Sequence, residues 1–211
     1  MDHARDAGSS ARAERRFDPD FYRRFYMSVR TRVTTRAEMA GRAEAVAAIV
    51  KQLDVPVHRI LDAGCGLGWM RAALRKAFPR ATYAGLEVSE HLCRRYGWIH
   101  ESLATFRPRG RYDLIICHDV MQYLGDREAV RALGNLARLC RGALYFHAPT
   151  RQDWRDTVDR SCSDGDIHLR SGDWYRARLS RNFRHAGCGV HVRRGVPYVQ
   201  WELEQPWRTG N

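Results

Sequence analysis

The sequence predicts an α/β fold in which a doubly wound, three-layer sheet is mostly parallel and ends in an antiparallel strand. Three observations support this prediction. An apolar run at 60–61 leads into Asp62 and then into three glycines at alternate positions. Strand-like runs alternate along the chain with segments of helical periodicity, as in a parallel sheet. Two final strand-like runs are joined by a short link at Pro197, which predicts a hairpin and therefore a reversed last strand.

The elements are predicted in order from local signals. A capping box at Thr35 and Glu38 begins a helix that we expect to end near Leu53. Strands are predicted at 60–62, 81–87, 112–117, 142–147, 189–192 and 198–204, and further helices at 69–78, 89–95, 126–140 and 174–185. In the helix that begins at Asp126, we expect one face to pack on the sheet, formed by Val130, Leu133, Ala137 and Cys140.

Composition indicates one folded domain over 35–211, preceded by a basic segment over 1–34 whose first 16 residues are predicted to be disordered. The 211 residues are 44% hydrophobic, which suffices for a core, and no apolar run approaches transmembrane length. The N-terminus has no apolar signal region, so we expect a cytoplasmic protein without membrane partners. The six cysteines form no C-x-x-C pair, which argues against zinc and for reduced thiols.

The net charge of +12 raises the question of a nucleic-acid partner. Only Lys51 and Lys76 are lysines and all other basic residues are arginines, a ratio that favours codon bias over phosphate recognition. The basic N-terminal segment leaves open an arm for RNA or for an acidic substrate. A solvated basic face is the simpler interpretation.

The glycine loop indicates which ligand the sheet holds. A dinucleotide fingerprint, G-x-G-x-x-G, would have its third small residue at position 69, where Trp69 stands instead. Asp62, directly before the loop, is a poor neighbour for a pyrophosphate and a good one for a cationic amino-acid group. The stretch Asp62-x-Gly64-x-Gly66-x-Gly68 therefore resembles motif I of the class I, Rossmann-like S-adenosylmethionine-dependent methyltransferases.

This resemblance implies a donor site for S-adenosyl-L-methionine, with S-adenosyl-L-homocysteine as product and no metal. Glu87, at the end of the second strand, would accept hydrogen bonds from the ribose hydroxyls, although an ordinary solvated glutamate is the alternative. Glu101 or Ser102 would hold the adenine amine unless they form a plain connecting loop. The full set that the resemblance assigns to the donor is Asp62, Gly64, Cys65, Gly66, Gly68, Glu87, Val88, Glu101, Ser102, Leu103 and His118.

Catalytic candidates stand where strands end. His118 and Asp119 follow the fourth strand and His147 follows the fifth, so a base for a proton-bearing acceptor would come from these three. The aromatic stripe near the N-terminus either packs on the domain or acts as a lid, and the Asp-rich insert at 150–173 suits a substrate loop. The substrate and lid candidates are Tyr22, Tyr26, Tyr123, Asp164 and His168.

A metal site at Asp164, Asp166 and His168 is not predicted, because the remaining ligands of a calcium loop are missing. The Asp/Asn-Pro-Pro-Tyr/Phe motif of nucleic-acid amino methyltransferases is also missing, and residues 118–121 stand at its position. The sequence therefore favours a methyltransferase with a small-molecule acceptor. An RNA or protein methyltransferase and a nicotinamide-dependent oxidoreductase remain as alternatives.

Overall fold

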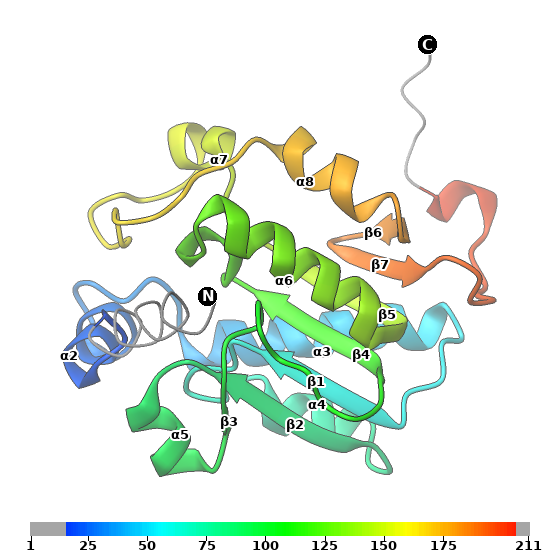
Figure 1. The fold of residues 1–211 in the computed structure, drawn as a ribbon, viewed down its shortest axis with the longest axis horizontal. Coiled ribbons are helices and arrows are strands. Elements are labelled where there is room, and N and C mark those ends of the chain that lie inside the picture. Colours follow the sequence, from blue (N-terminus) through cyan, green and yellow to red (C-terminus); the bar gives the residue numbers. More distant parts are fainter. Residues whose placement is uncertain (1–15, 206–211) are drawn as a thin grey trace, which may run out of the picture.

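The computed structural model describes residues 16–205, and within them seven strands form one sheet (Figure 1). The strand order is β3-β2-β1-β4-β5-β7-β6. Strands β1 to β5 are parallel to one another, whereas β7 is antiparallel to both β5 and β6. The strands are β1 Arg59–Ala63, β2 Thr82–Glu87, β3 Ile99–His100, β4 Tyr112–His118, β5 Cys140–His147, β6 Phe183–Gly187 and β7 Val190–Arg193. The predicted doubly wound sheet with an antiparallel strand is confirmed.

Helices cover both faces of this sheet. The helices are α2 Pro19–Tyr22, α3 Arg36–Gln52, α4 Arg71–Ala77, α5 Glu90–Tyr96, α6 Asp126–Leu139, α7 Arg151–Asp156 and α8 Gly172–Leu179. A π-helical turn, Arg23–Met27, extends α2, and 3-10 turns form at Met121–Tyr123 and Glu202–Glu204. Among the described residues, no helix combines the length and the apolarity that crossing a bilayer requires.

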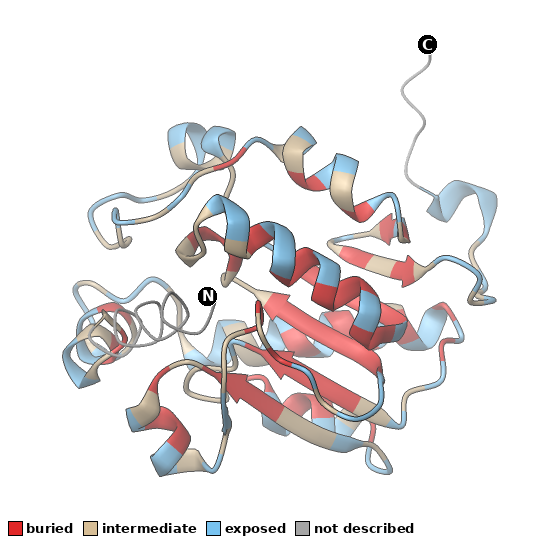
Figure 2. Cartoon of the chain, in the orientation of Figure 1, coloured by how far each residue is buried: buried red, intermediate tan, exposed pale blue. Residues whose placement is uncertain are grey.

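The core explains why β4 is apolar at nearly every position. Its residues alternate between the two faces, and both faces are covered by helices. Ile115 packs with the side chains of α6 and α8, while Leu114 and Ile116 pack with those of α3 and α4. All three are completely buried, and the strands are the most buried part of the molecule (Figure 2). The loops at the carboxyl ends of β1, β4 and β5 are thereby held on a rigid base.

The predicted elements at the C-terminus are partly wrong. The helix predicted over 174–185 ends at Leu179, and residues 183–187 form β6 instead. The hairpin turn lies at Gly187, Cys188 and Gly189, whose φ angles of 110°, 46° and 77° are left-handed. Two glycines around Cys188 make that turn possible, so the hairpin forms before Pro197. The predicted strand over 198–204 is irregular chain that ends in a 3-10 turn.

Two smaller predictions also need correction. Val130 lies on the outside of α6 and is 49% exposed, because Ala129, Ala132, Leu133 and Leu136 supply the buried face. Cys140 begins β5 and does not end the helix. The region at 98–103, for which no strand was predicted, contains the short strand β3, which pairs with β2.

The insert at 150–170 is closed at its base by a buried arginine. The backbone N–H of Arg151 donates to the carbonyl of Arg170 at 3.0 Å. The Arg170 guanidinium is 4% exposed and donates to the carbonyls of Met121 (2.9 Å) and Leu124 (2.6 Å) and to the Asp126 carboxylate (3.0 Å). One side chain therefore fixes the insert to the loop between β4 and α6.

Replacing Arg170 by alanine should lower the free energy of unfolding by about 2–4 kcal/mol, because buried carbonyls would lose their donors. Urea denaturation measures this directly. Arg176→Ala is the matched control, since Arg176 pairs with Asp173 on the exposed face of α8, and it should cost less than about 1 kcal/mol. Equal losses in the two variants would contradict the structural role of Arg170.

Candidate functional site

The loop between β1 and α4 requires glycine at three positions. Gly64, Gly66 and Gly68 have φ angles of 76°, 50° and 69°, a region that other residues rarely adopt. A Cβ atom at Gly64 would lie 2.3 Å from the Val120 side chain, and one at Gly68 would lie 2.6 Å from Trp98. At Gly66 a Cβ atom would meet nothing within 4 Å. Gly66 thus lies where a ligand can approach the backbone.

Glu87 holds this loop from the end of β2. Its Oε2 accepts from the Gly66 N–H at 2.8 Å, and its Oε1 accepts from the N–H groups of Val88 and Ser89 at 2.8 and 3.0 Å. Burial raises the pKa of Glu87, against the lowering effect of these three bonds. A carboxylate has about four acceptor positions, so one remains for a ligand hydroxyl. Hydrogen bonds from both ribose hydroxyls remain a prediction, and the second would replace one of these backbone bonds.

Asp62 is a buried carboxylate at the end of β1. It is 4% exposed and accepts a hydrogen bond from the Tyr83 hydroxyl at 2.6 Å. Burial raises its pKa to about 6, and the hydrogen bond from Tyr83 offsets only part of that effect. A cationic group of a ligand would supply the counter-charge that Asp62 lacks.

Two cavities adjoin at the carboxyl ends of the strands. The larger, about 520 Å³, is lined by the N-terminal segment, by the end of β2 and by residues 100–105. The smaller, about 330 Å³, is lined by the glycine loop, by the ends of β4 and β5 and by the insert. They share a set of five lining residues: Tyr26, Gly64, Gly66, Asp119 and Tyr123. A ligand in the larger cavity can therefore present one end to the smaller.

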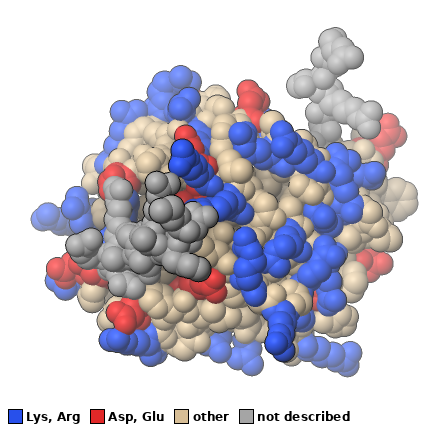
Figure 3. Space-filling view, viewed as in Figure 1, with Lys and Arg blue, Asp and Glu red and all other residues tan. Residues whose placement is uncertain are grey.

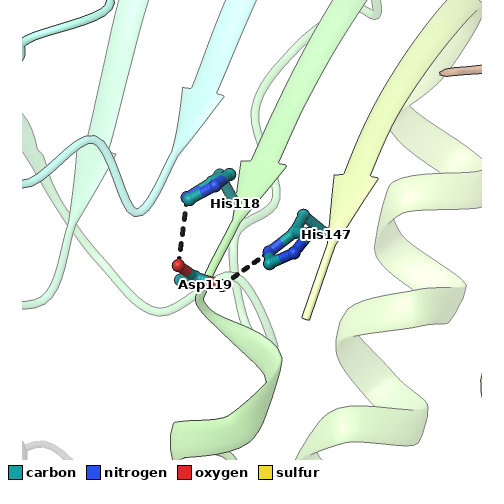
Figure 4. Close-up of side chains that lie close together, drawn as sticks. All are labelled: His118, Asp119 and His147. Atoms are coloured by element: carbon teal, nitrogen blue, oxygen red, sulfur yellow. Dashed lines mark hydrogen bonds and ion pairs between the residues drawn. The ribbon is translucent and has the colours of Figure 1, made fainter. Parts of the chain in front are cut away.

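His118, Asp119 and His147 meet at this junction (Figure 4). The Nδ1–H of His147 donates to Asp119 Oδ1 at 2.7 Å, and His118 Nδ1 lies 3.3 Å from Oδ2. The two imidazole rings stack with their centroids 4.8 Å apart. Asp119 has a φ of 55°, an unusual conformation for a residue with a side chain, and functional sites often contain such residues.

The electrostatics of the three groups keep Asp119 ionised. Burial raises the pKa of Asp119, but the neighbouring imidazoles outweigh it and the net shift is downward. Burial lowers the pKa of His118 to about 4, so this imidazole is neutral at pH 7. Ligand atoms of all three side chains lie within 4.8 Å of one another, a spacing that also suits a metal ion. The hydrogen bond at 2.7 Å already satisfies one Asp119 oxygen.

The structure distributes the predicted site residues between the two cavities. The larger is lined by Tyr22, Glu87, Val88, Glu101, Ser102, Leu103 and His168. The smaller is lined by Asp62, Cys65, His118, His147 and Asp164. Gly68 lines neither and supports the loop against Trp98. His168, predicted beside the substrate, lines the larger cavity, whereas Asp164 lines the smaller one.

Several residues of the site carried no sequence signal. The Trp98 indole N–H donates to the Gly66 carbonyl at 3.0 Å and fixes the loop. Gln122 and Trp154 line the smaller cavity. Arg16 joins the N-terminal segment to the insert, with contacts to Asp164 at 2.7 Å and to Asp166 at 2.9 Å. The contact between Arg16 and Asp164 spans 148 residues of sequence, so only the structure reveals it.

From Arg16 onward, the described part of the N-terminal segment packs over the larger cavity. Phe17 is buried, and its carbonyl accepts from the Ser89 hydroxyl at 2.6 Å. Its ring packs edge-on against Phe21 and Tyr123, with centroids 5.0 Å apart in each pair. Arg16 lies over the Tyr123 ring at 4.9 Å. The aromatic stripe predicted near the N-terminus is therefore packed on the domain beside the cavity that it lines.

The fold and the site together define an enzyme class. A doubly wound sheet with an antiparallel β7 carries a left-handed glycine loop, with acids at the ends of β1 and β2 that suit an amino-acid-bearing nucleoside. The chain matches the methyltransferase-domain family over residues 23–199 and belongs to it. Its sheet has the Rossmann-like fold of methyltransferases that have been solved with S-adenosylmethionine or S-adenosylhomocysteine bound.

Individual relatives are distant. The chain is 28% identical over 125 residues to malonyl-[acyl-carrier protein] O-methyltransferase of Anoxybacillus flavithermus, a match that covers 54% of this chain and only 48% of that protein. Magnesium protoporphyrin IX methyltransferase from Synechocystis PCC 6803, solved with S-adenosylhomocysteine, superposes with a TM-score of 0.62 at 20% identity, over 87% of this chain and 99% of that one. A plantazolicin methyltransferase complex superposes with a TM-score of 0.60 at 16% identity, over 84% of this chain and 76% of that one. These structures share the fold.

Asp62→Asn should raise the free energy of unfolding at pH 7 by on the order of 1–3 kcal/mol. The carboxyl pKa is higher in the folded protein than in the unfolded chain, so ionisation above about pH 4–6 destabilises the native state. Asparagine keeps an acceptor for Tyr83 and removes the charge. The same variant should bind S-adenosylhomocysteine at least about tenfold more weakly, because the ligand ammonium loses its counter-charge.

Asp113→Asn is the matched control. Burial raises the pKa of this carboxyl, but the opposite effect of Arg141 and two backbone N–H groups is larger, so the net pKa shift is downward. Removing the Asp113 charge should therefore destabilise the fold and leave the affinity for S-adenosylhomocysteine unchanged. Thermal melts and calorimetric titrations measure both properties. Destabilisation by Asp62→Asn, or unchanged affinity for S-adenosylhomocysteine, would remove Asp62 from the donor site.

Proposed function

We propose that this methyltransferase acts on a small-molecule acceptor that is held in the 330 Å³ cavity. The observation that carries the proposal is the shared wall of the two cavities at Asp119, where β4 and β5 end. A pocket of this size suits a metabolite, and part of it is needed for the amino-acid end of the donor. Acceptor and donor would meet beside the histidine pair.

The larger cavity, together with Asp62 in the adjoining wall of the smaller one, fits the donor. S-adenosylmethionine, when bound, supplies an electrophilic methyl group on a sulfonium. Asp62 would hold the ammonium, the remaining acceptor position of Glu87 would hold a ribose hydroxyl, and Leu103 would pack on the adenine. The open approach at Gly66 and the unpartnered Asp62 charge support this assignment. Positioning of the two reactants would supply much of the catalysis.

His147 is the proposed general base. Its Nδ1–H bond to Asp119 leaves the Nε2 lone pair available, and the carboxylate orients the ring and stabilises its protonated form. The His147 side chain is 45% exposed, so the accepted proton can pass to solvent. His118 is neutral and more deeply buried, which suits a hydrogen-bond acceptor beside the donor better than a proton carrier.

The N-terminal segment and the insert would act as a cover for the site. Tyr22 and Tyr26 come from the segment, and Asp164 from the insert. Arg16 ties the two together through Asp164 and Asp166. Exclusion of water from the reacting groups is the expected benefit. Protection of the bond after Arg23 or Arg24 from trypsin by S-adenosylhomocysteine would support this role.

The RNA or protein alternative depends on the basic surface. Figure 3 shows many Lys and Arg side chains on the face that α6 covers. The basic side chains of α6 are Arg127, Arg131 and Arg138. They lie on the outside of the helix, away from the core packing that β4 provides, and they do not line either cavity. The surface thus explains the net charge without indicating the acceptor.

The size class of the acceptor can be tested with a cell extract split by ultrafiltration. Each fraction is incubated with enzyme and donor carrying a trideuterated methyl group, and products are identified by mass spectrometry. We expect labelled products in the low-mass fraction alone. Labelled RNA or protein, with an unlabelled low-mass fraction, would overturn the proposal.

His147→Ala should lower kcat by about 10²–10⁴-fold at neutral pH, because the acceptor would lose its base. The affinity for S-adenosylhomocysteine should stay within about twofold of wild type, since His147 lines only the smaller cavity. His91→Ala, an exposed site on α5, is the control. Dialysis against a chelator should leave activity unchanged, because no metal is predicted. Full activity of His147→Ala would exclude it as the base.

A further inference from the structure

We infer that the acceptor is a protonated alkylamine, recognised by carboxylates and aromatic rings and deprotonated by His147. This inference rests on the proposed function and names the chemistry of the acceptor. It comes from the lining of the smaller cavity, whose charge is opposite to that of the protein as a whole.

The charged side chains of that cavity are acidic. Among the described lining residues there are four aspartates and no lysine or arginine, the aspartates being Asp62, Asp119, Asp159 and Asp164. Asp62 belongs to the donor in our assignment, and Asp164 is paired with Arg16 from the other side. Asp119 and Asp159 remain to face the acceptor. The net charge of +12 therefore lies outside this cavity, much of it on the surface in Figure 3.

Aromatic rings line the same space. Tyr26 and Trp69 pack edge-on with centroids 5.8 Å apart, and Tyr123 and Trp154 contribute from two other segments. The faces of aromatic rings attract cations, and Trp does so most strongly. A ring set beside carboxylates is a site for an ammonium group. A carboxylate acceptor would meet acids and ring faces with no cation to neutralise it.

Two buried acceptor atoms of the lining have no partner among the described residues. These are Nε2 of His118, whose Nδ1 faces Asp119, and Oε1 of Gln122, a side chain that is 5% exposed. Both atoms are closed off from the cavity, so a ligand N–H supplies the missing bond only when the His118 or Gln122 side chain turns toward it; the cost of about 1–3 kcal/mol for a buried polar atom without a partner favours that turn. An ammonium group carries three N–H donors, whereas a hydroxyl has one and a carboxylate none.

The reaction balances with the groups present. The ammonium gives one proton to Nε2 of His147 and becomes a neutral amine with a free electron pair. That pair forms the new N–C bond as the C–S bond of the donor breaks and leaves its electrons on sulfur. His147 passes the proton to solvent. The products are a methylated ammonium and S-adenosylhomocysteine, and no oxidant or metal is required.

The test uses matched ligands on the protein saturated with S-adenosylhomocysteine. Two sets share a skeleton and differ in the terminal group: 2-phenylethylamine, 2-phenylethanol and 3-phenylpropanoate, and hexylamine, hexanol and heptanoate. Calorimetry should show saturable binding of at least one amine, about tenfold or more tighter than its alcohol and carboxylate. Amines that do not bind, or a carboxylate that binds as tightly, would overturn the inference.

Asp159→Asn isolates the charge. Asparagine can still accept the Ser161 N–H bond at 2.9 Å that shapes this turn. We expect amine affinity to fall about threefold, with no change for the alcohols. Asp156→Asn also removes one negative charge, at the end of α7 and outside the cavity lining, and should change neither the amine affinity nor the alcohol affinity. Equal amine affinity in Asp159→Asn and Asp156→Asn would contradict the role of Asp159.

Failure of the proposed function gives a different result. If S-adenosylhomocysteine does not saturate the wild-type protein, the donor assignment is wrong and the acceptor inference falls with it. If it saturates the protein but amines are not preferred, only the inference is wrong. Labelled methyl transfer to the preferred amine, detected by mass spectrometry, should then occur with wild type and not with His147→Ala.

Discussion

The left-handed backbone of the loop after β1 is the constraint on which the site depends. Gly64, Gly66 and Gly68 can adopt it, and Glu87 and Trp98 hold it through the N–H and carbonyl of Gly66. Because Gly64 and Gly66 line both cavities, one loop forms part of the wall of each, the proposed donor site and the proposed acceptor site. The sheet beneath is buried on both faces, so this loop rests on a rigid base.

The site is maintained at a cost in stability. Asp62 is a buried carboxylate whose raised pKa shows that the fold disfavours its charge, and Asp119 adopts a left-handed φ of 55°. Asp113, of similar burial, is fully compensated by Arg141 and by two backbone donors. The contrast distinguishes Asp113, which stabilises the fold, from Asp62, whose charge has no cationic partner among the described residues. Unpartnered charge at strand ends is a physical indication of binding.

Local signals predicted the mostly parallel sheet and the residues at the ends of its strands. A capping box, strand runs and glycines specify elements through neighbours in sequence, and topology then brings residues 62, 87, 118 and 147 to one edge. The C-terminal hairpin was mispredicted because its turn depends on a left-handed cysteine, Cys188, which no propensity favours. The contacts of Arg16 and Arg170 were not predictable, since their partners come from distant segments.

The central claim is that the glycine loop and the two strand-end acids hold S-adenosylmethionine and no dinucleotide. Calorimetric titration of the purified protein with S-adenosylhomocysteine and with NADH tests it most directly. We expect one site for S-adenosylhomocysteine, weakened at least tenfold in Glu87→Ala, and no heat from NADH. Saturable NADH binding, with none for S-adenosylhomocysteine, would contradict the account.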